Sequence, residues 1–181
     1  ARALLEGGRF VAERPFRTPH HTATTISIVG GGHGQRPTPG EVSMAHNGVL
    51  FLDELPEFNR CALEVLRQPL EEGLVHIRRA IYSITFPSRF LLVAALNPCP
   101  CGYRGHPLKG CRCSIAEVQR YMTRLSGPLL DRIDIHVDVP PLSYDEIADR
   151  QPSGPSSAEV SEIVQAARTR QRTRANGKSA C

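Results

Sequence analysis

The sequence GVLFLDE, from Gly48 to Glu54, decides the fold that we predict for this chain. It is a continuous apolar run that ends in two carboxylates, a pattern typical of a parallel strand that is buried on both faces. A second apolar run, from Phe90 to Leu96, ends at Asn97 and Pro98. Alternating apolar and polar residues from Ile133 to Val139 predict a third strand. Together these segments predict a mostly parallel sheet.

Helices are predicted between and after these strands. The run from Pro56 to Gly73 has apolar residues at helical spacing and predicts one helix of about four turns. Capping boxes predict three further helix starts, at Ser114 with Glu117, Ser143 with Glu146, and Ser156 with Glu159. On the first of these, which we expect Gly127 to end, the shared apolar face is Ile115, Val118, Met122 and Leu125. Helices alternating with strands predict an α/β layered domain.

Two further segments predict hairpins or loops. LVHIRRAIYSITF, from Leu74 to Phe86, predicts a β-hairpin with Arg78, Arg79 and Ala80 near its turn. The stretch from Gly30 to Gly40 is rich in glycine and proline and predicts a flexible loop or hairpin. The ATTISIVGGG segment that leads into it is either a strand or a short helix, because periodicity does not separate the two.

The composition is ordinary for a soluble globular protein. Of the 181 residues, 40% are hydrophobic and 22% are charged, and the net charge of +4 is too small to argue for nucleic-acid binding by itself. The apolar runs are too short to cross a bilayer, and the first residues do not resemble a signal peptide. We therefore expect a cytoplasmic protein without a membrane partner.

Asp53 and Glu54 follow the first strand directly, at the edge where ligands of parallel sheets bind. One carboxylate can hold Mg²⁺, which prefers carboxylate oxygens and keeps several waters. The other can orient an attacking water. An acidic pair here can also serve only to cap the next helix and favour its dipole. The residues alone leave both interpretations open.

Asn97 and Arg132 are the other candidates for chemistry at this sheet. Asn97 ends the second strand, so its amide could reach the same water or a γ-phosphate; the alternative is a turn before Pro98. Arg132 precedes the third predicted strand, where a guanidinium could enter a neighbouring subunit's active site and neutralise transition-state charge. Pairing with Asp131 or Asp134 is the alternative role for Arg132.

Four cysteines are clustered as C-x-C, nine residues, C-x-C, at Cys99, Cys101, Cys111 and Cys113. Four thiolates can hold zinc tetrahedrally, while free thiols or oxidised pairs are the alternative. His106 inside the loop is a further candidate ligand that ranks below the cysteines. The adjacent His20 and His21 are not predicted to bind metal, because neighbouring side chains on an extended chain point apart.

Five segments in order carry a specific resemblance. RPFRTPHHT, PGEVSMAHNGVLFLDELPEF, LRQPLEEGLVHIRRA, FPSRFLLVAALNPCPCG and LSGPLLDRIDIHVDVP span Arg14 to Pro140. Together they resemble the family of ComM (YifB) competence proteins and magnesium-chelatase-like AAA+ ATPases. The resemblance implies a partial AAA+ core, a mostly parallel sheet flanked by helices with an inserted β-hairpin.

The same resemblance implies roles for the candidate residues. Asp53 and Glu54 correspond to the Walker B pair that handles Mg²⁺ and ATP, and Asn97 to the sensor 1 residue. Arg132 corresponds to an arginine finger acting in trans within a hexameric ring. Arg78 and Arg79 would lie near the tip of a hairpin that touches DNA; two arginines on a turn can contact phosphates without reading sequence. A solvated hairpin end is the alternative.

The resemblance also predicts where the domains begin and end and which nucleotide-binding motif this chain lacks. We expect a lead-in at 1–13, an AAA+ core fragment at 14–140 that includes a cysteine loop at 98–113, and a short helix, linker and basic helix at 141–181. The phosphate-cradling motif G-x-x-x-x-G-K-[ST] does not occur in the 181 residues and would precede Ala1 in the family. The fragment by itself is therefore expected not to hydrolyse ATP.

Three functions fit these residues. The leading hypothesis is a hexameric ATPase that moves single-stranded or branched DNA during competence and recombination, as a helicase or branch-migration motor. The alternative is the ATPase subunit of magnesium chelatase, which acts on a protein partner and is expected to carry an acidic stretch where this chain has its cysteines. A ring protein that has lost hydrolysis is the third, and the intact Asp53 and Glu54 disfavour it.

Overall fold

The computed structural model describes residues 13–32, 37–78, 83–142, 144, 148 and 154–175. The chain divides into two compact units, Ala1–Asp138 and Val139–Cys181. The sheet, both hairpins and every candidate site residue belong to the first unit. Within the second unit the structure describes one long helix, α8 (Ser157–Arg174), which opens with the predicted capping box at Ser156 and Glu159 and has no buried residue. The capping box predicted at Ser143 and Glu146 lies outside the described residues.

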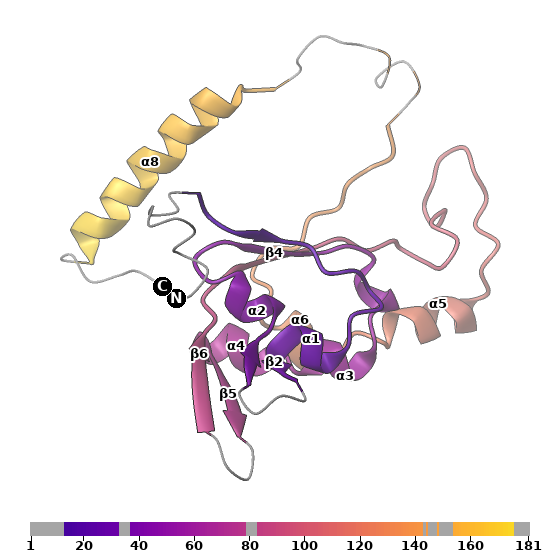
Figure 1. Cartoon of the computed structure of the whole chain (residues 1–181). Coiled ribbons are helices and arrows are strands. Elements are labelled where there is room, and N and C mark those ends of the chain that lie inside the picture. The colour runs from indigo at the N-terminus through magenta and orange to yellow at the C-terminus, as the bar shows by residue number, and fades with distance from the viewer. Residues whose placement is uncertain are drawn as a thin grey trace. The chain divides into compact units, whose positions relative to one another are not determined.

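The sheet of the first unit has three parallel strands in the order β1–β4–β7. They are β1 (Phe16–Arg17), β4 (Val49–Leu52) and β7 (Leu91–Ala94). The register sets Val49 beside Leu91 and Leu52 beside Ala94. Both apolar runs that predicted parallel strands therefore form them side by side, and the α/β fold class is confirmed (Figure 1).

Only one face of this sheet is buried among the described residues. Leu50 and Leu52 have no exposed surface, whereas Phe16 and Leu91, on the opposite face, are each 62% exposed. Figure 1 shows the short helices gathered on one side of β4. They are α1 (Thr25–Val29), α2 (Glu41–Met44), α3 (Arg60–Glu64), α4 (Arg67–Glu72) and α6 (Gly127–Leu130). The prediction that β4 is buried on both faces is wrong. A parallel strand is buried on both faces only when helices cover both sides of the sheet, and the described helices cover one side.

The single helix predicted from Pro56 to Gly73 is also wrong. The segment forms a 3₁₀ turn, η2 (Leu55–Glu57), and then α3 and α4, with a break at Val65 and Leu66. Pro69 explains the break, because proline has no N–H to donate to the carbonyl four residues earlier and its ring clashes with that carbonyl. The carbonyl in question is that of Val65. Pro69 is tolerated within the first turn of the new helix α4.

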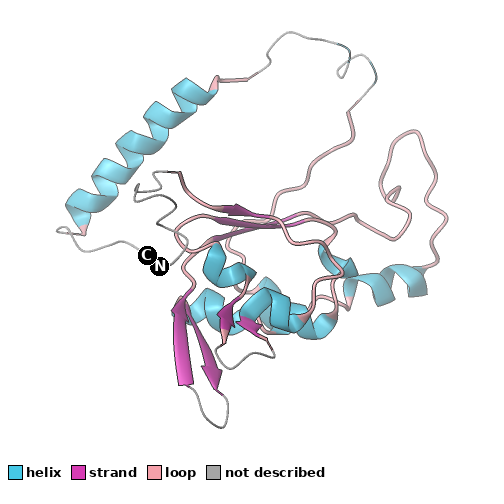
Figure 2. Cartoon of the chain, in the orientation of Figure 1, coloured by secondary structure: helices cyan, strands magenta, loops and turns pink. Residues whose placement is uncertain are grey.

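Two antiparallel hairpins extend the first unit (Figure 2). The predicted hairpin pairs β5 (Leu74–Arg78) with β6 (Ser83–Pro87). The glycine-rich stretch pairs β2 (Gly30–Gly31) with β3 (Thr38–Pro39), so it is a hairpin, and the segment before it is the helix α1. Gly30 has a φ of 102°, and a Cβ there would lie 2.4 Å from the Thr38 carbonyl oxygen. Only glycine fits that close approach.

Helix α5 (Ile115–Met122) begins with the predicted capping box but buries a different face. Val118 and Tyr121 are buried, while Ile115 and Met122 are exposed, so those two positions of the predicted face are wrong. Gly127 does not end this helix. The residue starts α6, with Ser126 as N-cap and proline at the next position.

The third predicted strand, Ile133 to Val139, is not a strand in the described structure. Three of its apolar members are exposed: Ile135 is 77%, Val137 74% and Val139 86% accessible. Alternation of residue type favours a strand only where a neighbouring strand takes up the backbone N–H and C=O groups. No described strand of the first unit pairs with this segment.

Among the described residues, no helix combines the length and apolar character needed to cross a membrane.

Candidate functional site

Asp53 and Glu54 lie where β4 ends, and both are exposed. Asp53 Oδ1 accepts a hydrogen bond of 2.9 Å from the Glu54 N–H. Glu54 has a φ of 52° and a ψ of 48°, in the left-handed region that residues other than glycine rarely adopt. Such conformations cluster at ligand-binding and catalytic sites. The turn at Glu54 therefore projects its carboxylate from the sheet edge.

Asn97 lies beyond the same edge of the sheet. Ala95 donates its N–H to the Leu52 carbonyl and accepts from the Leu55 N–H, each at 2.9 Å. These two bonds bracket Asp53 and Glu54 and hold the end of β7 against the end of β4. Asn97 follows two residues later, so the structure brings the acidic pair and Asn97 to one margin of the sheet.

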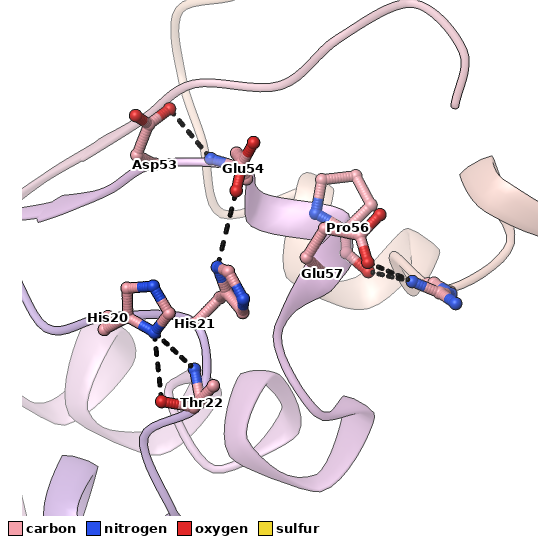
Figure 3. Close-up of polar contacts among 8 residues, drawn as sticks. His20, His21, Thr22, Asp53, Glu54, Pro56 and Glu57 are labelled. Atoms are coloured by element: carbon pink, nitrogen blue, oxygen red, sulfur yellow. Dashed lines mark hydrogen bonds and ion pairs between the residues drawn. The ribbon is translucent and has the colours of Figure 1, made fainter. Parts of the chain in front are cut away.

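His21 contacts the acidic pair directly (Figure 3). Its Nδ1 lies 3.4 Å from Glu54 Oε2, and its ring packs against the His20 ring with centroids 4.0 Å apart. His20 Nδ1 in turn lies 3.0 Å from Thr22 Oγ1. The histidine pair follows β1, which is the parallel neighbour of β4. The pair therefore reaches the same margin of the sheet as Glu54.

The end of helix α5 (Ile115–Met122) contacts the turn that follows the acids. Arg124, just beyond its end, donates from Nη1 to the Pro56 carbonyl and to Glu57 Oε2, both at 3.0 Å. Burial and the nearby carboxylates of Glu57 and Glu54 raise the pKa of Tyr121, against a smaller lowering by a hydrogen bond from the Asn97 backbone. The Tyr121 hydroxyl is therefore near Glu57, Glu54 and the Asn97 backbone.

Arg132 lies elsewhere in the first unit. Its side chain is 25% exposed and forms an ion pair with Glu71 of α4. Its Nη1 also donates to the Pro128 carbonyl. Among the described residues Arg132 makes no polar contact with Asp53, Glu54 or Asn97, so one chain does not unite all four candidates. Pairing with Asp131 or Asp134 is not what the described structure shows.

The proposed nucleic-acid contacts lie on the β5–β6 hairpin. Arg78 ends β5 with an exposed side chain, and Arg79 lies outside the described residues. Near the base of the hairpin, His76 contacts Thr85 at 2.9 Å and Glu72 at 3.4 Å. A role for the arginines in binding DNA stays a prediction.

With this geometry in view, comparison with known proteins decides the family. A family model described as magnesium chelatase, subunit ChlI, matches residues 2–147. This chain belongs to that family.

Several curated relatives resemble the chain along most of its length. It is 50% identical over 165 residues to a protein named YifB from Escherichia coli K12, covering 91% of this chain and 32% of that protein. It is 51% identical over 163 residues to competence protein ComM of Haemophilus influenzae, covering 90% and 31%. A Mycobacterium tuberculosis protein, Rv2897c, is 47% identical over 137 residues, covering 75% and 27%. The chain spans about a third of the length of the curated relatives it matches.

This ChlI-family chain also carries the predicted cysteine cluster. The Sγ atoms of Cys99, Cys101, Cys111 and Cys113 all lie within 4.8 Å of one another. Cys99 is fully buried, and the described cysteines form no disulfide. Backbone hydrogen bonds at Tyr103 and Arg112 lower the pKa of Cys101 to about 6. The donor set and spacing suit a metal that prefers four sulfur ligands.

His106 does not join that cluster. Its Nδ1 accepts from the Leu108 and Lys109 N–H groups at 3.1 and 3.2 Å, which uses the ring nitrogen within the loop itself. The sequence prediction that ranked His106 below the cysteines agrees with this arrangement.

Sequence reasoning missed Tyr121 and Arg124 near this site, and it placed His21 near the nucleotide by family resemblance without assigning its contact with Glu54. A signal existed for His21, because a segment that runs parallel to the acid-bearing strand must end at the same sheet edge. Tyr121 and Arg124 gave no such signal, since their partners lie 24 or more residues away and depend on how α5 docks.

Proposed function

We propose that the full-length protein is an AAA+ ATPase that moves single-stranded or branched DNA, with this chain supplying the hydrolytic edge of its nucleotide site. The observation that carries the proposal is the pairing of β4 with β7, which sets Asp53 and Glu54 beside Asn97. Family membership and the similarity to ComM and YifB support it.

The exposed carboxylates fit a magnesium-bound nucleotide, because Mg²⁺ takes oxygen ligands and keeps several of its waters. Asp53 would hold the ion through such water. Mg²⁺, when bound, neutralises charge that develops on the phosphates. Glu54, projected by its left-handed turn, would orient the attacking water and accept its proton. The Asn97 amide would bind the same water or the terminal phosphate.

His21 is suited to orient the carboxylate that does this work. Its Nδ1 lies 3.4 Å from Glu54 Oε2, close enough to restrict where that oxygen points. The His20 ring packs beside it and limits its own freedom.

Arg132 acts in trans in this proposal. Its separation from the acidic pair suits a finger that serves the next subunit of a ring, and an incoming subunit would compete with Glu71 for the guanidinium. Two inactive proteins test this idea, full-length Glu54→Gln and full-length Arg132→Ala. When mixed, the first supplies an intact arginine to the intact glutamate of the second, so ATPase activity should reappear. A mixture as inactive as its components would contradict a finger in trans.

Glu54→Gln by itself tests the catalytic assignment. Loss of the general base should lower kcat about 10²- to 10⁴-fold while ATP and DNA still bind. Glu57→Gln is the matched control, because Glu57 is an exposed neighbouring carboxylate that pairs with Arg124 instead. Undiminished hydrolysis by Glu54→Gln would remove Glu54 from this role.

DNA is the proposed substrate because the hairpin ends in adjacent arginines and the H. influenzae relative is named for competence. Arg78→Ala combined with Arg79→Ala should weaken DNA binding for all sequences alike. The slope of log affinity against log salt should fall by about one for each phosphate that the variant no longer neutralises. Arg60→Ala, on exposed helix surface, is the control that should leave the slope unchanged. An unchanged slope in the double variant would contradict contact between hairpin and DNA.

A magnesium-chelatase ATPase subunit that acts on a protein partner is the second candidate, favoured by the family description itself. The two functions differ in what stimulates turnover. Hydrolysis that rises with single-stranded or branched DNA supports the motor, whereas hydrolysis indifferent to DNA supports a protein-directed ATPase.

A further inference from the structure

The geometry points to a structural zinc site formed by Cys99, Cys101, Cys111 and Cys113, which fastens the tip of β7 to the start of α5. The inference concerns metal binding and does not rest on the proposed ATPase. It begins from the spacing of the sulfur atoms.

The Sγ of Cys99 lies 3.4 Å from that of Cys101 and 3.7 Å from that of Cys111, and Cys101 and Cys111 are also 3.7 Å apart. Four sulfurs around one zinc at a Zn–S distance of about 2.3 Å stand about 3.8 Å from each other. Disulfide-bonded sulfurs are about 2.0 Å apart. The three separations among Cys99, Cys101 and Cys111 are therefore close to the edges of a zinc tetrahedron, and the Cys113 sulfur lies within 4.8 Å of the other three.

The backbone around Cys101 is folded as a tight turn over the sulfurs. The Gly102 N–H donates to the Cys99 carbonyl at 3.0 Å, and Gly102 has a φ of 78°, which favours glycine.

The charge of the loop suits such a centre. Four thiolates and one Zn²⁺ carry a net charge of −2, since each thiol loses a proton on binding. Residues 98–113 contain no acidic residue and carry the basic residues Arg104, Lys109 and Arg112. Lys109 stacks over the Tyr103 ring, 5.0 Å from its centroid, which keeps one of these cations close to the turn.

The loop lacks another means of holding its shape. Residues 98–113 form no helix or strand, and Cys99 is the one residue among them with a buried side chain. Loops of this length without structure of their own are uncommon in compact domains. A bound metal would supply the missing constraint, because its ligands come from both ends of the loop.

The proposed metal ligands lie beside two elements of the candidate nucleotide site. Cys99 comes two residues after Asn97, and Cys113 directly precedes Ser114, the N-cap of α5. The same helix places Tyr121 near Glu57 and Glu54, and the residues just after it bring Arg124 to Glu57. Zinc would therefore tie the strand that ends at Asn97 to the helix that flanks Glu54.

Metal analysis of the full-length protein, purified without added metal, tests the inference. We expect about one zinc per chain. Cys101→Ser and Cys111→Ser should each reduce the zinc content to background, whereas Cys61→Ser should not, because Cys61 is an exposed cysteine of α3 outside the cluster. Iron in place of zinc, or no metal together with freely reactive thiols, would overturn the inference.

A second measurement covers the case in which the serine variants do not fold. The unmodified full-length protein is exchanged with Co²⁺, whose absorption spectrum reports a tetrahedral site with four thiolate ligands. That spectrum supports the inference, and a spectrum without thiolate bands contradicts it. Neither result depends on ATP hydrolysis, so failure here and failure of the proposed function are distinguishable.

Discussion

The acidic edge and the start of the cysteine loop lie at the same margin of the sheet, yet they are held in different ways. Asp53 and Glu54 follow a strand whose inward side chains are fully buried and whose backbone is paired on both sides. The loop from 98 to 113 has no paired strand and a single buried side chain. The comparison teaches that packing places the acids, whereas the loop depends on the proposed zinc ligands for its order. Each of the following predictions tests whether the sheet and the loop respond differently to the same kind of change.

The largest effect is expected from the core beneath the acids. Leu50→Ala removes a fully buried side chain from β4 and should lower the free energy of unfolding by about 2–5 kcal/mol. Leu108→Ala is the matched change in the loop, where the leucine is 87% exposed, and should change stability by less than about 0.5 kcal/mol. Denaturant unfolding of both variants measures the contrast. Equal losses would contradict it.

Removal of the proposed zinc should loosen the loop and leave β4 unchanged. After chelation, amide hydrogen exchange at residues 98–113 should become roughly 10- to 100-fold faster, because their order depends on the ligands. Exchange in β4 should stay slow, since Leu50 and Leu52 keep their packing. Hydrogen exchange with mass spectrometry resolves the two segments. Acceleration of equal size in β4 would show that the loop and the sheet unfold together.

A smaller effect is expected at the junction between the two regions. Arg124→Ala removes the hydrogen bond to the Pro56 carbonyl and the ion pair with Glu57. Because the guanidinium is about half exposed, the loss should be only about 0.5–1 kcal/mol. Arg120→Ala, on the exposed surface of the same helix, should be neutral. Thermal unfolding of both variants checks this, and identical midpoints would exclude a clamp at Arg124.

The smallest effect concerns the helix that leaves the loop. A backbone hydrogen bond from Ser114 lowers the pKa of Glu117 below its ordinary value of 4.5. A lowered folded-state pKa means that the capping box contributes fully above the ordinary value and is lost as pH falls through the lowered one. The stability difference between wild type and Glu117→Gln should therefore shrink on acidification. Glu162→Gln, outside any capping box, should show no such trend.

Local patterns predicted the parts of the fold that local physics determines. β4 and β7 could be identified because a continuous apolar run is stable only when it is buried, as in a parallel strand. The cap of α5 could be identified because its hydrogen bonds join residues only three positions apart. The break before α4 was not predicted, although Pro69 signals it because proline has no N–H to donate to the Val65 carbonyl. Ile133 to Val139 could not be assigned correctly, because a strand depends on a partner that the segment itself does not encode.

Some residues of the candidate site could be predicted from local sequence and others could not. Asp53, Glu54 and Asn97 were predictable as neighbours because parallel strands end at one edge, and the register confirms that arrangement. Their catalytic roles stay predictions. Tyr121 and Arg124 were not predictable, because their contacts join segments far apart in sequence. The convergence of four cysteines was predictable from spacing alone.

The half-covered sheet has a practical consequence for laboratory work. Phe16, Leu91 and Val93 form an exposed apolar surface. Within the described part of the chain, β7 is an edge strand, so one side of its backbone is unpaired. An exposed apolar surface beside an unpaired strand edge promotes self-association of the protein. A polypeptide of these 181 residues should scatter light increasingly with concentration.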